Sequence, residues 1–203
     1  MRRWPILLLA YPIVAHLGVV YGTPVPAIIL LIALLSLSFR QAMVRRERTH
    51  VLILTLYAVG TLTMIDWLGL RGALYLPPVM ANATVAYWFA RSLMPGQTDL
   101  ITRIAAQIEP EMTPDLTRYC RRVSWAWACF SAALALATAA IAIAAPIEIW
   151  SWFTNFAIYL LIAGFFIGEW LTRIWVLGRG RTAGPLRILK SLPHFDYRRL
   201  LYA

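Results

Sequence analysis

The chain has 203 residues, of which 61% are hydrophobic and only 14% are charged. A soluble domain carries a charge at about a quarter of its positions, so this composition excludes an ordinary soluble protein. A net charge of +10 would suggest nucleic acid binding in a soluble chain. Here the charges lie in clusters between apolar runs, which indicates a polytopic membrane protein in contact with membrane lipids and argues against a nucleic acid partner.

Apolar runs recur along the chain and predict an all-α polytopic transmembrane bundle of about six spans, forming a single membrane domain over residues 1–203. The expected spans are residues 4–21, 25–39, 50–68, 73–90, 123–145 and 150–170. The second span is short for about 30 Å of hydrocarbon. The fourth contains Pro77 and Pro78, which predict a kink or a break because proline removes a backbone donor.

Two segments are too polar for a span: a loop at residues 91–122, between spans four and five, and a basic tail at residues 172–203. Thr98 and Asp99 are expected to provide the N-cap and the first turn of a helix within the loop. An apolar stripe then follows at Ile101, Ile104, Ala105 and Ile108. The stripe predicts a short amphipathic helix lying in the membrane interface; the alternative is a surface helix docked on the loop itself.

The positive charges set the orientation. With six spans and both termini in the cytoplasm, all 19 Lys and Arg residues except Arg71 fall on the cytoplasmic side. This asymmetry follows the positive-inside rule and supports the span count. The loop contributes the basic cytoplasmic face: Arg91, Arg103, Arg118, Arg121 and Arg122.

Polar side chains inside spans are costly and are therefore candidates for function. Four stand out as candidate intramembrane binding residues: His16, Asp66, Asn82 and Asn155. The simpler interpretation is structural, with hydrogen bonds between helices for His16 and the two asparagines, and a position at the interface or a pair with Arg71 for Asp66. The alternative is a polar lining for a lipid or isoprenoid head group.

Glu169 and Arg173 stand four residues apart, in the order that favours an ion pair on one helix, and we expect a structural pair there. Cys120 and Cys129 lie nine residues apart on one predicted helix, roughly 13 Å at the α-helical rise. This spacing is too long for a disulfide, so we expect two free thiols with a packing role.

Catalytic and ligand-binding patterns are not evident. The three histidines are far apart in the sequence, no zinc or nucleotide-binding motif is present, and the glycine-rich stretch near the C-terminus is basic and follows a helix. We therefore expect no catalytic residue, no metal and no cofactor.

From Pro77 onward the chain resembles a family of bacterial inner-membrane proteins. The residues that carry the resemblance are PPVMANATVAYWFARSL (77–93), DLITRIA (99–105), RYCRRVSWAWACF (118–130) and FTNFAIYLLIAGFFIGEWLTR (153–173). Members of that family are often encoded among fatty-acid-synthase-like genes for aryl polyene or xanthomonadin-type pigments. The resemblance implies the bacterial inner membrane and a pathway setting, and it carries over no catalytic residue.

Three functional hypotheses follow. The first is a non-enzymatic accessory or scaffolding subunit whose basic face docks an acidic carrier protein or an acyltransferase, since opposite charge favours encounter. The second is a small transporter or flippase for a lipid-linked product, using the fourth span and Asp66. The third is an intramembrane acyl or prenyl transferase that uses His16 or Asp66.

Overall fold

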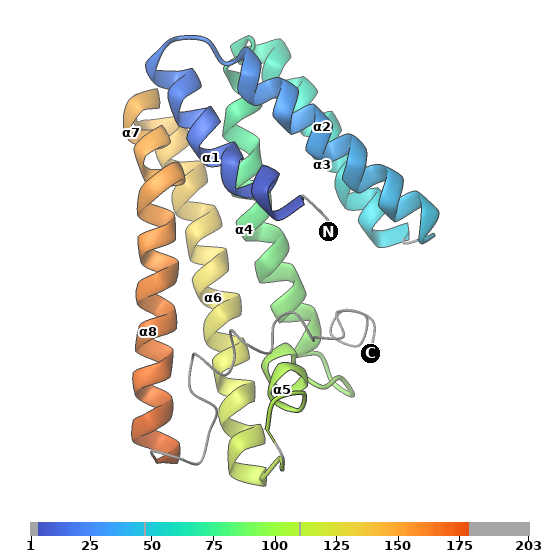
Figure 1. Ribbon diagram of the computed structural model, residues 1–203, viewed down its shortest axis with the longest axis vertical. Helices are drawn as coiled ribbons and strands as arrows, with labels where there is room; N and C mark the ends of the chain where they lie inside the picture. Colours follow the sequence, from blue (N-terminus) through green and yellow to red (C-terminus); the bar gives the residue numbers. More distant parts are fainter. Residues whose placement is uncertain (1–3, 47, 110, 179–203) are drawn as a thin grey trace. The chain divides into compact units, whose positions relative to one another are not determined.

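The computed structural model describes residues 4–46, 48–109 and 111–178. Over these residues the chain folds into helices and turns without a strand, which confirms the all-α prediction (Figure 1). The elements are α1 (Trp4–Val20), α2 (Val25–Val44), α3 (Arg48–Leu68), α4 (Gly72–Ser92), α5 (Leu100–Ala105), α6 (Pro114–Ala144), α7 (Ile147–Trp152), the π-helical turn η1 (Phe153–Ala157) and α8 (Ile158–Leu177). From residue 179 onward, the predicted basic tail lies outside the described residues.

Four described segments are long and apolar enough to cross a membrane: α2, α3, α6 and the run Ile147–Leu177, which joins α7, η1 and α8. The other two predicted spans fall outside this group. α1 has only 17 residues, and α4 has 21 residues but carries Asn82, Arg91 and two prolines. The structure therefore supports a membrane-embedded helical protein, and the count of six spans stays a prediction.

Two helices differ from the spans expected for them. α2 continues to Val44 instead of ending at residue 39, because no glycine or proline stops it there, and the basic loop becomes a short turn in which Arg46 has a φ of 55°. α4 remains one helix through Pro77 and Pro78. Both prolines stand in its second turn, so only two backbone hydrogen bonds near the start of the helix are lost.

The described helices fall into two compact units, and α4, α6 and α8 contribute residues to both. In the first unit (Met1–Ala81 and Leu134–Tyr159), α2 packs against α1 and α3, and α1 also packs against α7 and η1. The buried residues at its centre are Ala15, Ala27, Leu74 and Trp150. The ring of Tyr75 covers Trp150, with ring centroids 4.7 Å apart.

Glycines allow α3 and α4 to approach closely within the first unit. A β-carbon added at Gly60 would lie 2.8 Å from the Leu76 side chain. One added at Gly72 would overlap the carbonyl oxygen of Met64, which belongs to the backbone and cannot rotate away. The absence of a side chain at these positions therefore sets the distance between the two helices.

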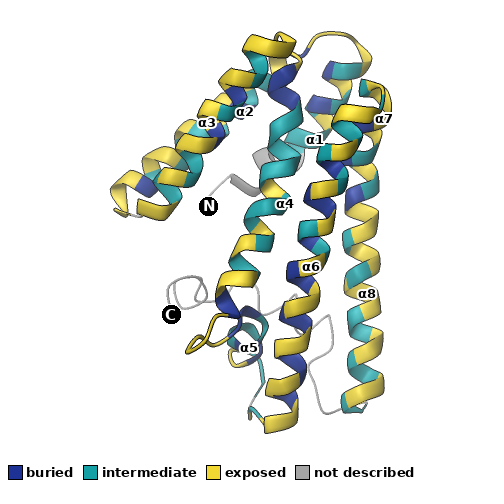
Figure 2. Cartoon of the chain, turned by 180° about the vertical axis from the view of Figure 1, so that it is seen from behind, coloured by how far each residue is buried: buried dark blue, intermediate teal, exposed yellow. Residues whose placement is uncertain are grey.

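The second unit (Asn82–Ala133 and Leu160–Ala203) is built around Trp127 of α6. Its ring stacks on Phe89 of α4 at 5.8 Å and meets Phe165 and Phe166 of α8, each at 4.7 Å between centroids. α6 supplies a buried stripe to this unit, visible as dark blue along the helix in Figure 2, which includes Tyr119, Cys120, Val123, Ser124, Trp127 and Ala128. α6 therefore supplies much of the buried surface of this unit.

Candidate functional site

The polar segment between α4 and α6 is folded into an ordered structure, which we call the platform. It consists of α5 and the segments that join α5 to its neighbours, residues 93–113, of which residue 110 is not described. Ala105 packs against Leu116 and Cys120 of α6, so α5 docks on the protein through one face. This agrees with the docked surface helix that the sequence left open, and a position in the membrane interface stays a prediction.

Asp99 anchors the platform. Its side chain is the N-cap of α5, which begins where the sequence predicted a helix start at Thr98 and Asp99, and accepts a hydrogen bond from the Thr102 backbone N–H at 3.1 Å. The carboxylate also accepts from the Thr102 hydroxyl at 2.7 Å and from the Ser124 hydroxyl of α6 at 2.5 Å. Asp99 is only 3% exposed. Three donors therefore compensate for the burial of this carboxylate.

Two serines tie the start of α5 to both neighbouring helices. The Leu100 N–H donates to Ser92 Oγ at 3.1 Å, and Ser92 donates in turn to the Phe89 carbonyl of α4 at 2.8 Å. The Ile101 N–H donates to Ser124 Oγ of α6 at 3.2 Å. Ser124 is fully buried. The sequence did not single out Ser124 or Ser92, because their partners lie 23 and 8 residues away and no periodic pattern links them.

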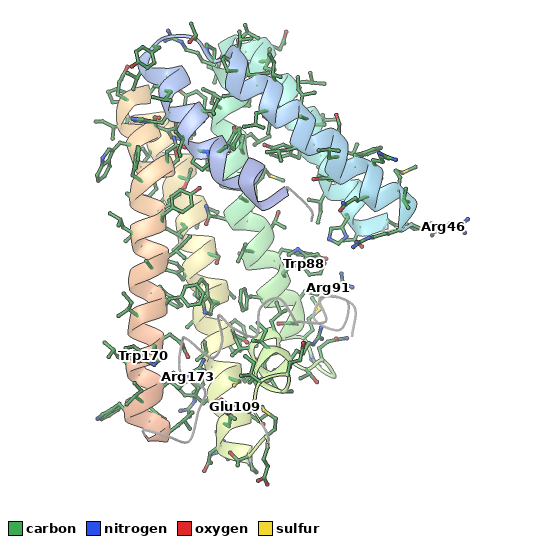
Figure 3. The ribbon with its side chains drawn as sticks, in the orientation of Figure 1. Arg46, Trp88, Arg91, Glu109, Trp170 and Arg173 are labelled. Carbon is green, nitrogen blue, oxygen red and sulfur yellow. The ribbon has the colours of Figure 1, made fainter. Side chains whose placement is uncertain are left out.

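The basic face surrounds this anchored segment. Four of its five arginines are exposed, and Arg103 is half-buried; Figure 3 labels Arg91 at the last turn of α4. Arg121 donates from Nη2 to the Leu93 carbonyl at 3.0 Å, which satisfies an acceptor at the end of α4. Arg118 meets Asp115 at 3.5 Å, and both side chains are well exposed, so this ion pair adds little stability.

The predicted pair between Glu169 and Arg173 is present on α8. Glu169 Oε1 accepts from Arg173 Nη2 at 2.7 Å and from Nε at 2.9 Å, and both side chains are largely buried. The Tyr119 hydroxyl of α6 donates to the Glu169 carbonyl at 3.1 Å and lies 3.3 Å from Oε1. These contacts join α6 to α8, and Arg173 is labelled on α8 in Figure 3.

A second polar cluster lies in the first unit and joins two predicted site residues. His16 Nδ1 of α1 lies 3.0 Å from Ser151 Oγ of α7, and Asn155 Nδ2 of η1 donates to the same oxygen at 3.2 Å. Asn155 also donates to the Ser151 carbonyl at 2.8 Å. If Asn155 supplies one proton to the Ser151 oxygen, the serine hydroxyl is free to donate to an unprotonated His16 Nδ1.

This cluster resembles a nucleophile and its base only in part. Ser151 is fully buried, and the partner of His16 on this side is a hydroxyl with an amide behind it, without a carboxylate to orient the ring. The ring of His16 also meets Phe156 edge-on, with centroids 4.8 Å apart. The arrangement is suited to holding α1 against α7 and η1, the structural role that the sequence suggested for His16 and Asn155.

The remaining predicted residues are not brought to this cluster. Asp66 is exposed at the end of α3 and forms no ion pair with Arg71, which is exposed as well. Asn82 is half-buried on α4 and belongs to the second unit. Cys120 and Cys129 are free thiols, as expected, the first buried and the second exposed. Among the described residues, no group of three or more side chains could hold a metal ion.

Comparisons of the chain with known protein families, with curated proteins and with solved structures gave no match.

Proposed function

We propose that this protein is an integral membrane protein that docks a soluble partner at the platform and acts as an accessory or scaffolding subunit. The observation that carries the proposal is the anchoring of the platform through Asp99, which is 3% exposed and accepts three hydrogen bonds. A segment fixed in this way holds its surface side chains in constant positions. Such preorganisation lowers the entropy that must be lost when a partner binds.

The charge of this surface indicates the class of partner. Arg91 at the end of α4 and Arg118 near the start of α6 are exposed next to the platform in the sequence, whereas the carboxylate of Asp99 is withdrawn from the surface. An acidic carrier protein would be attracted to this face and would meet it more often. The resemblance to membrane proteins encoded among fatty-acid-synthase-like genes points to the same class, and we place the platform in the cytoplasm of a bacterium.

The two alternatives need an accessible polar site within the membrane. A flippase or transporter would move a head group past intramembrane polar side chains, and a transferase would expose its reactive group to substrate. Ser151 is fully buried between its partners, and Asp66 lies at the exposed end of α3. Neither residue favours these alternatives over docking.

The test measures binding of an acidic acyl carrier protein to the full chain in nanodiscs of neutral lipid. The Arg91→Gln/Arg118→Gln variant removes two exposed charges from different helices and should weaken binding by about 5- to 10-fold, because each exposed charge contributes up to about 1 kcal/mol. Binding by the unchanged chain should also weaken as salt rises from low to physiological strength, since exposed charges are screened over about 10 Å.

Arg45→Gln/Arg46→Gln is the matched control, because it removes the same charge at the turn between α2 and α3 and should leave the affinity unchanged. Equal loss in both variants would mean that the carrier protein responds only to net charge. No binding by the unchanged chain, or binding that salt does not affect, would contradict docking at the platform.

A further inference from the structure

The exposed face of α6 within the second unit carries different types of side chain at successive turns of the helix. Arg121 and Arg122 are exposed in the third turn, Trp125 is 55% exposed one turn later, and Cys129 and Ala133 are exposed after that. Residues three and four apart share a face of an α-helix, so both arginines lie directly beside Trp125. The order along this face is guanidinium, indole and then small apolar side chains.

The depth of this face follows from the length of the helix. α6 has 31 residues, roughly 46 Å at about 1.5 Å per residue. This length matches a whole bilayer of about 40–45 Å including head groups, and exceeds the hydrocarbon of about 30 Å. The span expected at residues 123–145 covers the hydrocarbon, at roughly 34 Å for 23 residues, so Arg121 and Arg122 lie just outside it at the level of the lipid head groups. Trp125 lies one turn deeper, where tryptophan side chains gather.

α4 has the same pair of side-chain types, but in the sequence its aromatic residue comes before its arginine. Tyr87 is 42% exposed and precedes the exposed Arg91 by four residues, so the aromatic ring again lies one turn away from the platform. α4 leads into the platform and α6 leads out of it, and both are in contact through Phe89 and Trp127. On both helices the arginine lies closer to the platform than the exposed aromatic ring does. This arrangement supports placing the arginines of both helices at the level of the lipid head groups.

The charges of Arg121 and Arg122 are available to an external anion. Arg121 gives one N–H to the Leu93 carbonyl and keeps its other donors. In the described part of the chain, neither arginine forms an ion pair; the nearby Asp115 meets Arg118, one turn further from Trp125. A guanidinium pair with open donors matches the oxygen atoms of a phosphate.

We infer that Arg121, Arg122 and Trp125 form a binding site for an anionic phospholipid. The two guanidinium groups hold the phosphate, the indole packs at the level of the ester groups, and an acyl chain runs along Cys129 and Ala133. Small side chains at these two positions let the acyl chain lie close to the helix. The site does not depend on a docked protein, because it faces the lipid from within the membrane.

The experiment compares retention of phosphatidylglycerol and phosphatidylcholine by the purified full chain, using native mass spectrometry after mixed-lipid nanodiscs. We expect phosphatidylglycerol to be retained at least about 10-fold over phosphatidylcholine. Each basic side chain near the membrane surface attracts anionic lipid by about 1 kcal/mol. Arg121→Gln/Arg122→Gln removes both charges and should therefore abolish the preference, and Trp125→Ala should reduce it by about 3-fold.

Arg45→Gln/Arg46→Gln is again the matched control and should retain the preference. Arg122→Lys, which keeps the charge but loses the planar fork, should keep part of it, and this variant guards against a loss caused by misfolding. Equal retention of the two lipids, or equal loss in the control, would overturn the site. Because no carrier protein is present, failure here leaves the docking proposal to its own test.

Discussion

Gly72 begins α4 where any side chain would collide with the backbone of α3. A β-carbon at this position would overlap the Met64 carbonyl oxygen, and backbone atoms cannot move away as a flexible side chain can. Gly72→Ala should therefore destabilise the first unit by about 1–3 kcal/mol, the usual cost of forced overpacking. For a chain of this length, the midpoint of thermal unfolding in detergent should fall by roughly 3–10 °C.

Gly164→Ala is the matched control for this change. Gly164 is also helical, but nothing lies within 4 Å of a β-carbon added there. Alanine is favoured over glycine inside a helix by up to about 1 kcal/mol, so the midpoint should stay the same or rise. If Gly72→Ala were as stable as Gly164→Ala, the close contact between α3 and α4 would be absent in the protein.

Some contacts between individual side chains could be predicted from the sequence, and others could not. The pair between Glu169 and Arg173 follows from a spacing of four on one helix and is present at 2.7 Å. The bond between His16 and Ser151 links residues 135 positions apart, and only the packing of α1 against α7 brings them together. Spacing reports neighbours within one helix, whereas contacts between helices depend on packing that no local pattern encodes.

The platform is the element whose order depends on one buried group. Asp99→Asn keeps the shape of the side chain but replaces an acceptor oxygen with an N–H₂ group that faces donors from Thr102 and Ser124. Leaving buried polar groups unpaired costs about 1–3 kcal/mol. Hydrogen exchange of backbone amides between residues 93 and 109 should therefore quicken by roughly 5- to 150-fold, while the amides of α6 near Trp127 stay protected.

Asp115→Asn provides the comparison for the platform. Asp115 stands in the first turn of α6, and its side chain is exposed beside Arg118. Removing this exposed charge should change exchange in the platform by less than about 3-fold, since exposed ion pairs contribute about 0–1 kcal/mol. Similar exchange rates in the two variants would show that Asp99 is not the anchor.

Element boundaries show where a sequence pattern is a good guide and where it is not. Local capping chemistry predicted that a helix begins at Thr98 and Asp99, and α5 has its N-cap at Asp99. The apolar stripe predicted a helix as far as Ile108, whereas α5 ends at Ala105 and residues 106–108 form a turn. The π-helical turn at Phe153–Ala157 left no signal, since it differs from an α-helix only in backbone pairing.

For the whole molecule, the number of spans is decided by α1 and α4, which fall outside the group of four membrane-length segments. We predict six spans from the distribution of Lys and Arg, with Arg71 alone on the far side. Reporter fusions after Arg46, Gln107 and Ala203 should then all report the cytoplasm, and a fusion near Gly69 should report the opposite side. The fusion at Gln107 is decisive, because it lies beyond α4.

Reporter results that contradict six spans would identify the helix that does not cross the membrane. If Gly69 and Gln107 reported the same side, α4 would not cross the membrane and the platform would not lie where the docking proposal needs it. If Arg46 and Ala203 reported different sides, one of the later helices would fail to cross. A fusion near Gly22, at the turn between α1 and α2, separates a missing α1 from either case.

The π-helical turn at Phe153–Ala157 changes the direction, around the helix axis, in which the side chains of the following residues point. An α-helix turns by about 100° per residue, and a π-helical turn takes up one additional residue. Residues beyond Ala157 are therefore rotated by about 100° from the positions that an even α-helix would give them. Trp150 packs in the first unit and Phe165 in the second, each in its own phase. Deleting one residue within Phe153–Ala157 should therefore convert the turn to an even α-helix.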